Sequence, residues 1–448
     1  MDGSELYGKE KVSKILIKTA PPVMIAQLIQ ALYNIVDSFF VGKNGEDGLT
    51  ALSIVYPLQL LMIALAVGSG VGVNTVMAAR LGVGRKKESD ECAGVGTPIA
   101  FGIWLVFAIL CFLLMPAYAR VSTDSSSVIN EVIIYGRIVC VFSVFLFLES
   151  VWTKILQARG DMKTPMTAQI IGAIINIALD PLLIFGWGVF PKMGIAGAAV
   201  ATVLGQMAAA LVVMKKGYCK PPERRKFTPY IKQIFKMGTP NILMQSAYTF
   251  YIFGLNLILS TFSDAAVTVL GLYYKWQTFF FIPLGAMQTC IVPIISFNYA
   301  AGDMSRCKKT MNASIIFGAV LMCLGTLCFA FIPVPMLKLF SSDNEVLRIG
   351  AHAFPIIGLS FAPMVTSLTF PVFFQAVGSS FKSSALTVFR TVILFVPLGY
   401  LLSRFGLGYF WLTYPITDSL SSLLGLVLYI AFLKSKRKTQ IEEMLGKH

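Results

Sequence analysis

Charged residues and histidine are scarce in this chain, and cysteine forms no motif. Only 13% of the 448 residues are charged, whereas 56% are hydrophobic; an average soluble domain has about 25% charged residues. The only two histidines, His352 and His448, make a histidine-based catalytic or metal site unexpected. The eight cysteines include no CxxC pair and no Cys/His cluster, so no metal site or disulfide framework is expected. The composition excludes a soluble domain of any size and is typical of a membrane protein.

Apolar runs long enough to cross a hydrocarbon core of about 30 Å as helices recur through the whole sequence. The first run follows "KEKVSKILIK" and is longer than the apolar core of a signal peptide, so we interpret it as the first membrane span rather than as a cleaved leader. Hydropathy and polar breaks predict an all-α polytopic membrane protein with twelve transmembrane helices. The predicted spans are 14–41, 50–79, 93–116, 129–157, 165–189, 194–214, 237–262, 266–299, 310–333, 347–377, 384–403 and 409–433.

The basic residues are distributed unequally between alternate connections. Of the 37 Lys and Arg residues, 27 fall on the side that carries both termini and only six on the opposite side. The positive-inside rule therefore predicts cytoplasmic N- and C-termini in the cytoplasmic membrane, which agrees with an even number of crossings. The net charge of +15 is thus interpreted as a topology signal, and no nucleic-acid partner is expected.

The two halves of the chain resemble each other at a constant offset of 218 residues. The offset relates three sets of residues: Pro22, Gln27 and Tyr33 to Pro240, Gln245 and Tyr251; Gly84 to Gly302; and Gln157, Ala158 and Gly160 to Gln375, Ala376 and Gly378. The sequence therefore predicts two six-helix bundles related as parallel repeats, an arrangement common in secondary transporters. The predicted divisions are an N-lobe at 1–214, a basic cytoplasmic linker at 215–236, a C-lobe at 237–433 and a basic cytoplasmic tail at 434–448.

Acidic residues inside predicted spans mark the candidate site, because a charge at mid-bilayer costs about 2.5–3.5 kcal/mol even on insertion scales. One face of the first span carries Gln30, Tyr33, Asn34 and Asp37. The fifth span places Asn176 four residues before Asp180, and the sixth adds Thr202. Two such carboxyl groups with amide and hydroxyl neighbours could bind a proton, or Na⁺ at Asp37, Asn176, Asp180 and Thr202. The alternative is that they are structural polar residues at a helix interface.

The second half does not repeat this pattern. The offset relates Asp37 to Leu255, and the charges inside the C-terminal spans are instead Lys275, Arg390 and Asp418. An ion pair of Asp418 with Arg390 or Lys275 is expected, with contact to an anionic substrate or lipid as the alternative.

Two prolines and one further acid also lie within predicted spans. Pro22 and Pro181 are expected to bend the first and fifth spans, because proline removes a backbone donor and crowds the preceding turn. Glu149 lies near the middle of the fourth span without an obvious partner, and its role is left open.

Several segments together resemble the multidrug and toxic compound extrusion (MATE) family. They are "PPVMIAQLIQALYNIVDSFFVG", "RLGVGRKK", "LQARGDMKTPM", "NIALDPLLIFG", "GIAGAAVATVLGQ" and, in the second half, "FNYAAGD" and "FQAVG". The resemblance covers essentially the whole chain and implies a V-shaped, two-lobed exporter of twelve helices. It also implies that Asp37 is the coupling residue, supported by Gln30, Tyr33, Asn176, Asp180 and Thr202, with Pro22 as the bend of the first helix. The seventh span lacks the glutamate found in family members with a C-lobe ion site, so the chain resembles the branch with an N-lobe cation site.

These observations predict a cation-coupled multidrug antiporter that exports organic, mostly cationic amphipathic compounds, with H⁺ favoured over Na⁺ as the coupling ion. A lipid-linked oligosaccharide or lipid flippase of the same superfamily is the alternative. An intramembrane aspartic protease would need a GxGD signature, which neither "NIVDS" nor "IALDP" supplies, so no enzyme activity is expected. We expect no cofactor; the expected partners are small-molecule drugs or toxins and membrane lipids, and the protein is expected to be a monomer.

Overall fold

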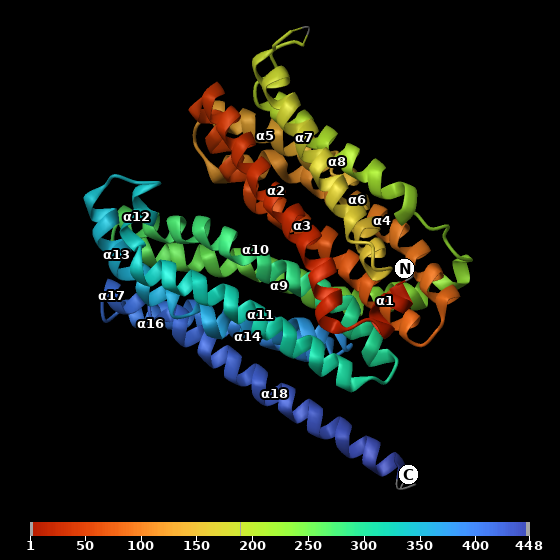
Figure 1. The fold of residues 1–448 in the computed structure, drawn as a ribbon. Helices are drawn as coiled ribbons and strands as arrows, with labels where there is room; N and C mark the ends of the chain where they lie inside the picture. The colour runs from red at the N-terminus through yellow and green to blue at the C-terminus, as the bar shows by residue number, and fades with distance from the viewer. Residues whose placement is uncertain (1–2, 189, 445–448) are drawn as a thin grey trace. The chain divides into compact units, whose positions relative to one another are not determined.

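The computed structural model describes residues 3–188 and 190–444, and every regular element in those ranges is a helix. The elements are α1 (Gly3–Lys9), α2 (Val12–Asn44), α3 (Glu46–Gly82), α4 (Lys86–Ser122), α5 (Ser126–Val141), α6 (Val144–Ala158), α7 (Lys163–Phe185), α8 (Ile195–Gly217), η1 (Arg224–Lys226), α9 (Phe227–Leu259), α10 (Asp264–Ala300), α11 (Met304–Phe331), α12 (Pro333–Lys338), α13 (Asn344–Gly358), α14 (Phe361–Ala376), α15 (Ser380–Val388), the π-helical η2 (Phe389–Phe395), α16 (Val396–Ser403), α17 (Leu407–Phe410) and α18 (Thr413–Met444). Figure 1 labels most of them.

The prediction of twelve membrane helices is confirmed. Within the described ranges, eleven helical segments are long and apolar enough to span a membrane, and the bent pair α13 and α14 supplies a twelfth. That pair corresponds to the predicted tenth span and bends by 54°. The predicted fourth span, 129–157, is formed by α5 and α6, which the structure counts as one segment from Ser126 to Ala158.

The helices extend beyond the predicted spans at several ends. α9 begins at Phe227, so the second half of the predicted linker is helical. Its first turns bury Tyr230 and Ile234 while Lys232 and Lys236 are exposed, and a hydropathy average cannot detect such an amphipathic segment. α18 likewise continues through most of the predicted tail, of which 445–448 lie outside the described residues.

Two compact units make up the chain. Unit 1 comprises Met1–Ser246 and Gly285–Thr310, and unit 2 comprises Ala247–Leu284 and Met311–His448. α9 and α10 are each divided between the two units. The part of α9 that contains Gly238 and the part of α10 that contains Phe297 pack against α3 in unit 1. A Cβ built on Gly238, for example, would lie 2.6 Å from the Gly68 carbonyl oxygen. The lobe boundaries at 215 and 237 therefore stay a prediction based on the repeat.

Turns at matching positions support the repeat. Gly160 (φ 84°) and Gly378 (φ 80°) follow α6 and α14 and have the same left-handed backbone, which glycine adopts without steric cost. Each donates its N–H to the carbonyl of the glutamine three residues earlier, at 3.0 Å. Gly84 (φ 75°) and Gly302 (φ 82°), after α3 and α10, form another matched pair.

The short helix α1 was not predicted, and it is anchored within unit 1. The Tyr7 side chain is fully buried, and its hydroxyl donates to the Gln157 carbonyl oxygen at 2.5 Å. Its own carbonyl oxygen accepts from Asn298 Nδ2 at 3.1 Å and from an Arg306 guanidinium nitrogen at 2.7 Å. The N-terminal helix thus joins the ends of α6, α10 and α11.

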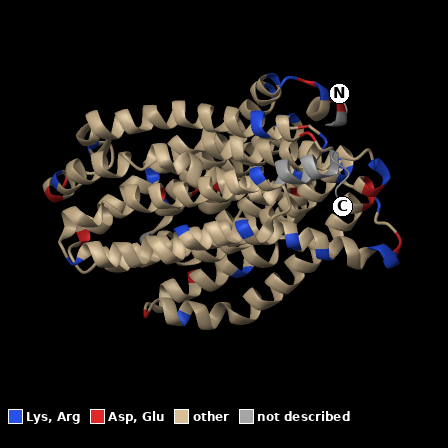
Figure 2. Ribbon diagram, turned by 90° about the horizontal axis from the view of Figure 1, so that it is seen from below, with Lys and Arg blue, Asp and Glu red and all other residues tan. Residues whose placement is uncertain are grey.

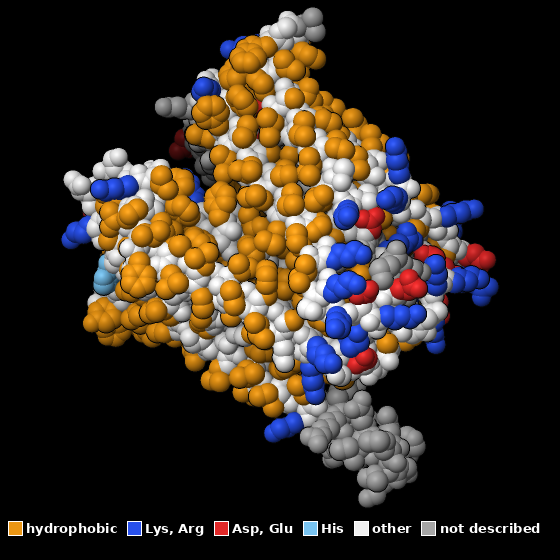
Figure 3. Space-filling model, in the orientation of Figure 1, with side chains coloured by type: hydrophobic (Ala, Val, Ile, Leu, Met, Phe, Trp, Pro, Cys, Tyr) orange, Lys and Arg blue, Asp and Glu red, His pale blue; other side chains and the backbone are white. Residues whose placement is uncertain are grey.

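Hydrophobic side chains cover much of the outer surface, as expected for helices that face lipid. Val106 and Leu113 on α4 are 60% and 65% exposed, and Figure 3 shows hydrophobic side chains over most of the visible helix flanks. Most of the helical length carries neither acid nor base (Figure 2). At one end of unit 1, basic and acidic residues instead form pairs, such as Arg159 with Asp90 at 2.8 Å.

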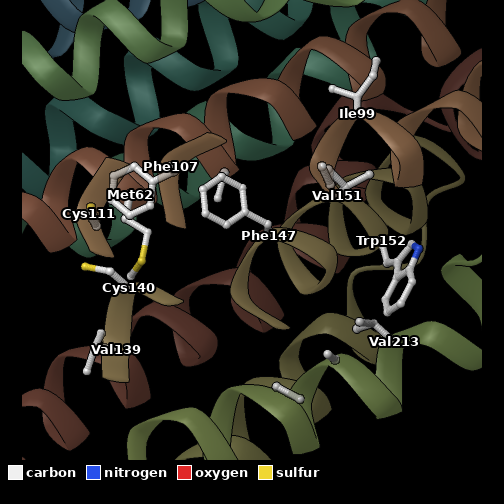
Figure 4. Close-up of a cluster of buried hydrophobic side chains, with 14 of the residues drawn as sticks. Met62, Ile99, Phe107, Cys111, Val139, Cys140, Phe147, Val151, Trp152 and Val213 are labelled. Carbon is white, nitrogen blue, oxygen red and sulfur yellow. The ribbon is translucent and has the colours of Figure 1, made fainter. Parts of the chain in front are cut away.

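A dense apolar core stabilises unit 1. Phe147 of α6 lies between Phe107 and Met62 on one side and Val151 on the other (Figure 4). The Phe147 and Phe107 ring centroids are 6.1 Å apart. Around this core, close helix crossings depend on glycine, as is common in membrane proteins.

One such crossing yields a testable stability prediction. A Cβ at Gly72 of α3 would overlap the Ile234 carbonyl oxygen of α9, so Gly72→Ala should force the two backbones apart and destabilise the protein by about 1–3 kcal/mol. Thermal unfolding of the detergent-purified protein measures this effect. Gly102→Ala is the matched control, because a Cβ there meets nothing within 4 Å. Equal melting temperatures for the two variants would contradict the predicted close packing.

Candidate functional site

Asp37 of α2 and Asp180 of α7 are buried carboxyl groups on neighbouring helices of unit 1. They are 7% and 0% exposed, and they are close enough for their charges to interact. Asp37 Oδ1 and Asp180 Oδ2 have no hydrogen-bond partner within the described ranges, and no described Lys or Arg pairs with either. These two carboxyl groups are therefore buried without an ion pair in the described ranges.

The predicted neighbours of this acid pair lie around it. Asn176 Nδ2 donates to Asp180 Oδ1 at 3.4 Å, as expected for residues four apart on one helix face. Tyr33 interacts electrostatically with Asp37, and the Gln30 side chain lies within hydrogen-bonding reach of the Tyr33 hydroxyl.

A cavity of about 50 Å³ lies beside this group, within unit 1. Four of the predicted residues, Gln30, Tyr33, Asn176 and Thr202, are among those that line it, whereas the two aspartates are not. The other lining residues are Leu146, Glu149, Gln169, Gly172, Ala173, Gly205, Gln206 and Ala209. α2, α7 and α8 thus bring the predicted residues together from three separate stretches of sequence.

Sequence reasoning missed Tyr135 and Gln59 at this site. Tyr135 of α5 is 1% exposed, and its hydroxyl accepts from Gln59 Nε2 at 3.2 Å. It interacts with Asp37, Tyr33 and Asp180. A lone tyrosine or glutamine in an apolar span was the only sequence signal, and tertiary contacts were needed to interpret it. Glu149, left open above, and Gln206 are also at the cavity.

The predicted hinge prolines lie within continuous helices. Pro22 is in the uninterrupted α2, and Pro181 directly follows Asp180 within α7. Their proposed role in bending is a property of a conformational change, so it stays a prediction.

In unit 2, Arg390 is the base that pairs with Asp418. Arg390 Nε donates to Asp418 Oδ1 at 2.7 Å, and the Ser367 hydroxyl donates to the same oxygen at 2.8 Å. Lys275, the other candidate, instead lies 5.2 Å from the Phe340 ring centroid. Arg390 belongs to the π-helical turn η2, a type of distortion that often marks functional sites.

No group of three or more His, Cys, Asp or Glu residues that could hold a metal ion occurs in the described part of the chain. The donor set at Asp37, Asn176, Asp180 and Thr202 consists of oxygens that suit a small hard cation such as Na⁺. A Na⁺ ion there stays a prediction.

Comparison with known proteins identifies the family. The family model MatE matches residues 22–182 and again residues 240–401, at the two places where the repeat begins. A FAD transporter of Shewanella oneidensis is 25% identical over 432 residues, covering 93% of this chain and 94% of that protein. The probable multidrug resistance protein YoeA of Bacillus subtilis is 26% identical over 443 residues, covering 94% of each chain. The multidrug export protein MepA of Staphylococcus aureus is 22% identical over 456 residues, 99% of this chain and 100% of that protein.

Solved structures agree on the fold. A multidrug resistance MATE family transporter in an outward-facing conformation has a TM-score of 0.89 at 23% identity, covering 97% of this chain and 99% of that one. A mutant of the VcmN transporter from Vibrio cholerae has a TM-score of 0.90 at 19% identity, covering 95% and 97%. The matched proteins are transporters rather than enzymes. Since the family model matches both halves of the sequence, the chain belongs to the MatE family of multi-pass membrane transporters.

Proposed function

We propose that this protein is a cation-coupled multidrug antiporter, which exports organic cations across the cytoplasmic membrane in exchange for H⁺ rather than Na⁺. The observation that carries the proposal is the pair of buried carboxyl groups, Asp37 and Asp180, with unpartnered oxygens and no basic neighbour in the described ranges. An unpaired carboxylate in such surroundings is stabilised by binding a proton or another cation. The pair is therefore suited to hold the coupling ion.

The coupling follows from competition for negative charge. With Asp37 and Asp180 ionised, the neighbouring cavity attracts a cationic compound; with a proton bound, that attraction decreases and release is favoured. Gln30, Tyr33, Asn176 and Thr202 position the ion-binding groups and form part of the cavity wall. Bending of α2 at Pro22, or of α7 at Pro181, would transmit the change in charge to the helices. We place both termini in the cytoplasm and take the monomer as the working unit.

The charge of the residues that line the cavity favours export of cations over two alternative functions, both of which involve anionic cargo. A flippase for lipid-linked oligosaccharides and a carrier of FAD would both handle phosphate-bearing anions. Among the residues that line the unit 1 cavity, the charged one is an acid, Glu149. An acidic wall opposes anionic cargo and favours cations.

Proteoliposomes with an imposed gradient test the proposal. Inward-directed proton and Na⁺ gradients are compared for efflux of a fluorescent cationic dye such as ethidium, with equal gradients of K⁺ as the control. We expect the proton gradient to accelerate efflux at least fivefold and the Na⁺ gradient to have little effect. Efflux driven by Na⁺ alone would support antiport but show that Na⁺, not H⁺, is the coupling ion. Efflux that responds to neither gradient would contradict coupled antiport.

A further inference from the structure

Glu149 is the charged residue that lines the unit 1 cavity, and one of its two carboxylate oxygens accepts no hydrogen bond from the described residues. Its Oε1 accepts hydrogen bonds from Thr153 Oγ1 at 2.8 Å and Gln169 Nε2 at 3.1 Å. These two donors fix the side chain, which is only 5% exposed. Oε2 makes no hydrogen bond to the described residues, and the side chain lines the cavity. A carboxylate held in place by two donors therefore presents an oxygen without a hydrogen bond at the cavity.

Glu149 forms no ion pair with a described base, although Lys154 interacts with it electrostatically and offsets part of its charge. Lys154, on the same helix, directs its Nζ to Gln157 Oε1 at 3.0 Å. No described Lys or Arg lies within 4 Å of the Glu149 oxygens. The other charged groups near the cavity are Lys154, which interacts electrostatically with Glu149, and the acids Asp37 and Asp180; Asp37 and Glu149 both interact with Tyr33. The acids outnumber the one base. The field in the cavity thus favours a positive ligand.

Two further acceptors on the cavity wall are unsatisfied. Asn176 Oδ1 and Gln206 Oε1 are both buried without a hydrogen-bond partner within the described ranges, and both residues line the cavity. The Asn176 amide is oriented by donation of its Nδ2 to Asp180. A buried acceptor without a donor costs about 1–3 kcal/mol. A ligand that brings N–H groups would recover this cost, whereas a cation without donors would not.

The remaining wall suits an organic ligand. Leu146, Ala173 and Ala209 supply apolar surface, and Tyr33 supplies an aromatic ring. The cavity volume of about 50 Å³ gives room for a few water molecules, so the cavity holds the charged end of a ligand rather than the whole molecule.

We propose that this cavity is a binding subsite for cations that carry N–H donors, namely protonated amines and amidinium groups, with Glu149 as their counter-ion. The subsite deepens the proposed function, because it names the cargo class, but it can be tested by binding without transport. Glu149 and Gln206 select the cargo, whereas Asp37 and Asp180 hold the coupling ion. Charge-assisted hydrogen bonds to Glu149, Asn176 and Gln206 give the selectivity.

Binding of two cations to the purified full-length protein tests the subsite. One is 4′,6-diamidino-2-phenylindole (DAPI), which has amidinium N–H groups; the other is tetraphenylphosphonium, which has none. Isothermal titration calorimetry measures both for the wild type and for Glu149→Gln. We expect Glu149→Gln to raise the Kd of DAPI at least tenfold and that of tetraphenylphosphonium less than threefold. Equal losses for the two ligands would overturn the proposal, because they would reduce Glu149 to a general source of negative potential.

Two more variants make the result decisive. Glu131→Gln of α5 is the matched control, since Glu131 also has a buried, unpartnered oxygen but is not among the lining residues; it should leave both affinities unchanged, and a loss as large as that of Glu149→Gln would refute the subsite. If Glu149→Gln does not purify as a monodisperse protein, Gln206→Leu removes an acceptor without changing charge. It should weaken DAPI at least threefold and not tetraphenylphosphonium, and an unchanged DAPI affinity would contradict the proposal.

Transport by the same variant separates this subsite from the coupling mechanism. Glu149→Gln should still export tetraphenylphosphonium under a proton gradient, because Asp37 and Asp180 are intact. Selective loss of DAPI binding in a protein that shows no gradient-driven transport at all would support the subsite and reject the proposed antiport. Coupled transport without selective binding would do the reverse.

Discussion

Asp37→Asn should abolish dye efflux driven by a proton gradient, with a residual rate below about 5% of the wild type, while the protein still folds and inserts. The substitution keeps the size and the hydrogen-bonding capacity of the side chain but removes the group that binds and releases the proton. Because Asp37 is 7% exposed and its Oδ1 has no partner, no hydrogen bond or ion pair in the described ranges depends on its charge. The measurement is initial efflux from proteoliposomes, normalised to the amount of reconstituted protein.

Two more variants accompany this prediction: Asp180→Asn is a second test of the acid pair, and Asp124→Asn is the control. Asp180 interacts with Asp37 across α2 and α7, so its replacement should also reduce coupled efflux by more than tenfold. Asp124 is exposed after α4, and its replacement should have no effect. Wild-type efflux by Asp37→Asn would show that Asp37 is structural, and the coupling mechanism proposed here would then be wrong.

The number and order of the membrane helices could be predicted from sequence because hydropathy reports directly on residence in lipid. The ends of the helices could not be predicted in this way. The first turns of α9 are amphipathic, and α1 is only Gly3–Lys9, so neither raises an average over about 19 residues. The break between α13 and α14 was also not predicted, since both sides of the bend are apolar and hydropathy does not report a bend within an apolar segment.

The candidate site was predictable where its residues share one helix. Asn176 and Asp180 are four residues apart, which by itself places them on one helix face, and their hydrogen bond follows from that spacing. Tyr135 and Gln59 are 76 residues apart, and only tertiary packing brings them to the aspartates. Glu149 was conspicuous as an acid in a span, but its significance depends on which of its oxygens is already occupied, which sequence cannot indicate.

The buried ion pair of unit 2 leads to the second large effect. Arg390 and Asp418 are 5% and 0% exposed, so removing one partner leaves an uncompensated buried charge. Arg390→Met or Asp418→Leu alone should lower stability by about 3–5 kcal/mol, whereas the double variant should recover most of that loss, because an apolar pair of similar volume replaces both charges. Thermal unfolding in detergent for the four proteins gives the comparison.

The same double variant decides what the pair does. The guanidinium also lies 4.9 Å from the centroid of the Phe395 ring, and Asp418 Oδ2 has no partner in the described ranges, so the pair has contacts beyond its own hydrogen bond and an oxygen to spare. If the double variant is stable and transports as the wild type does, the pair only keeps two charges compatible with the interior of unit 2. If it is stable but inactive, the pair takes part in binding or in movement of η2, and the anionic substrate or lipid considered from the sequence becomes the next ligand to test. A double variant as unstable as the singles would instead show that packing of these side chains, rather than their charge, holds the helices together.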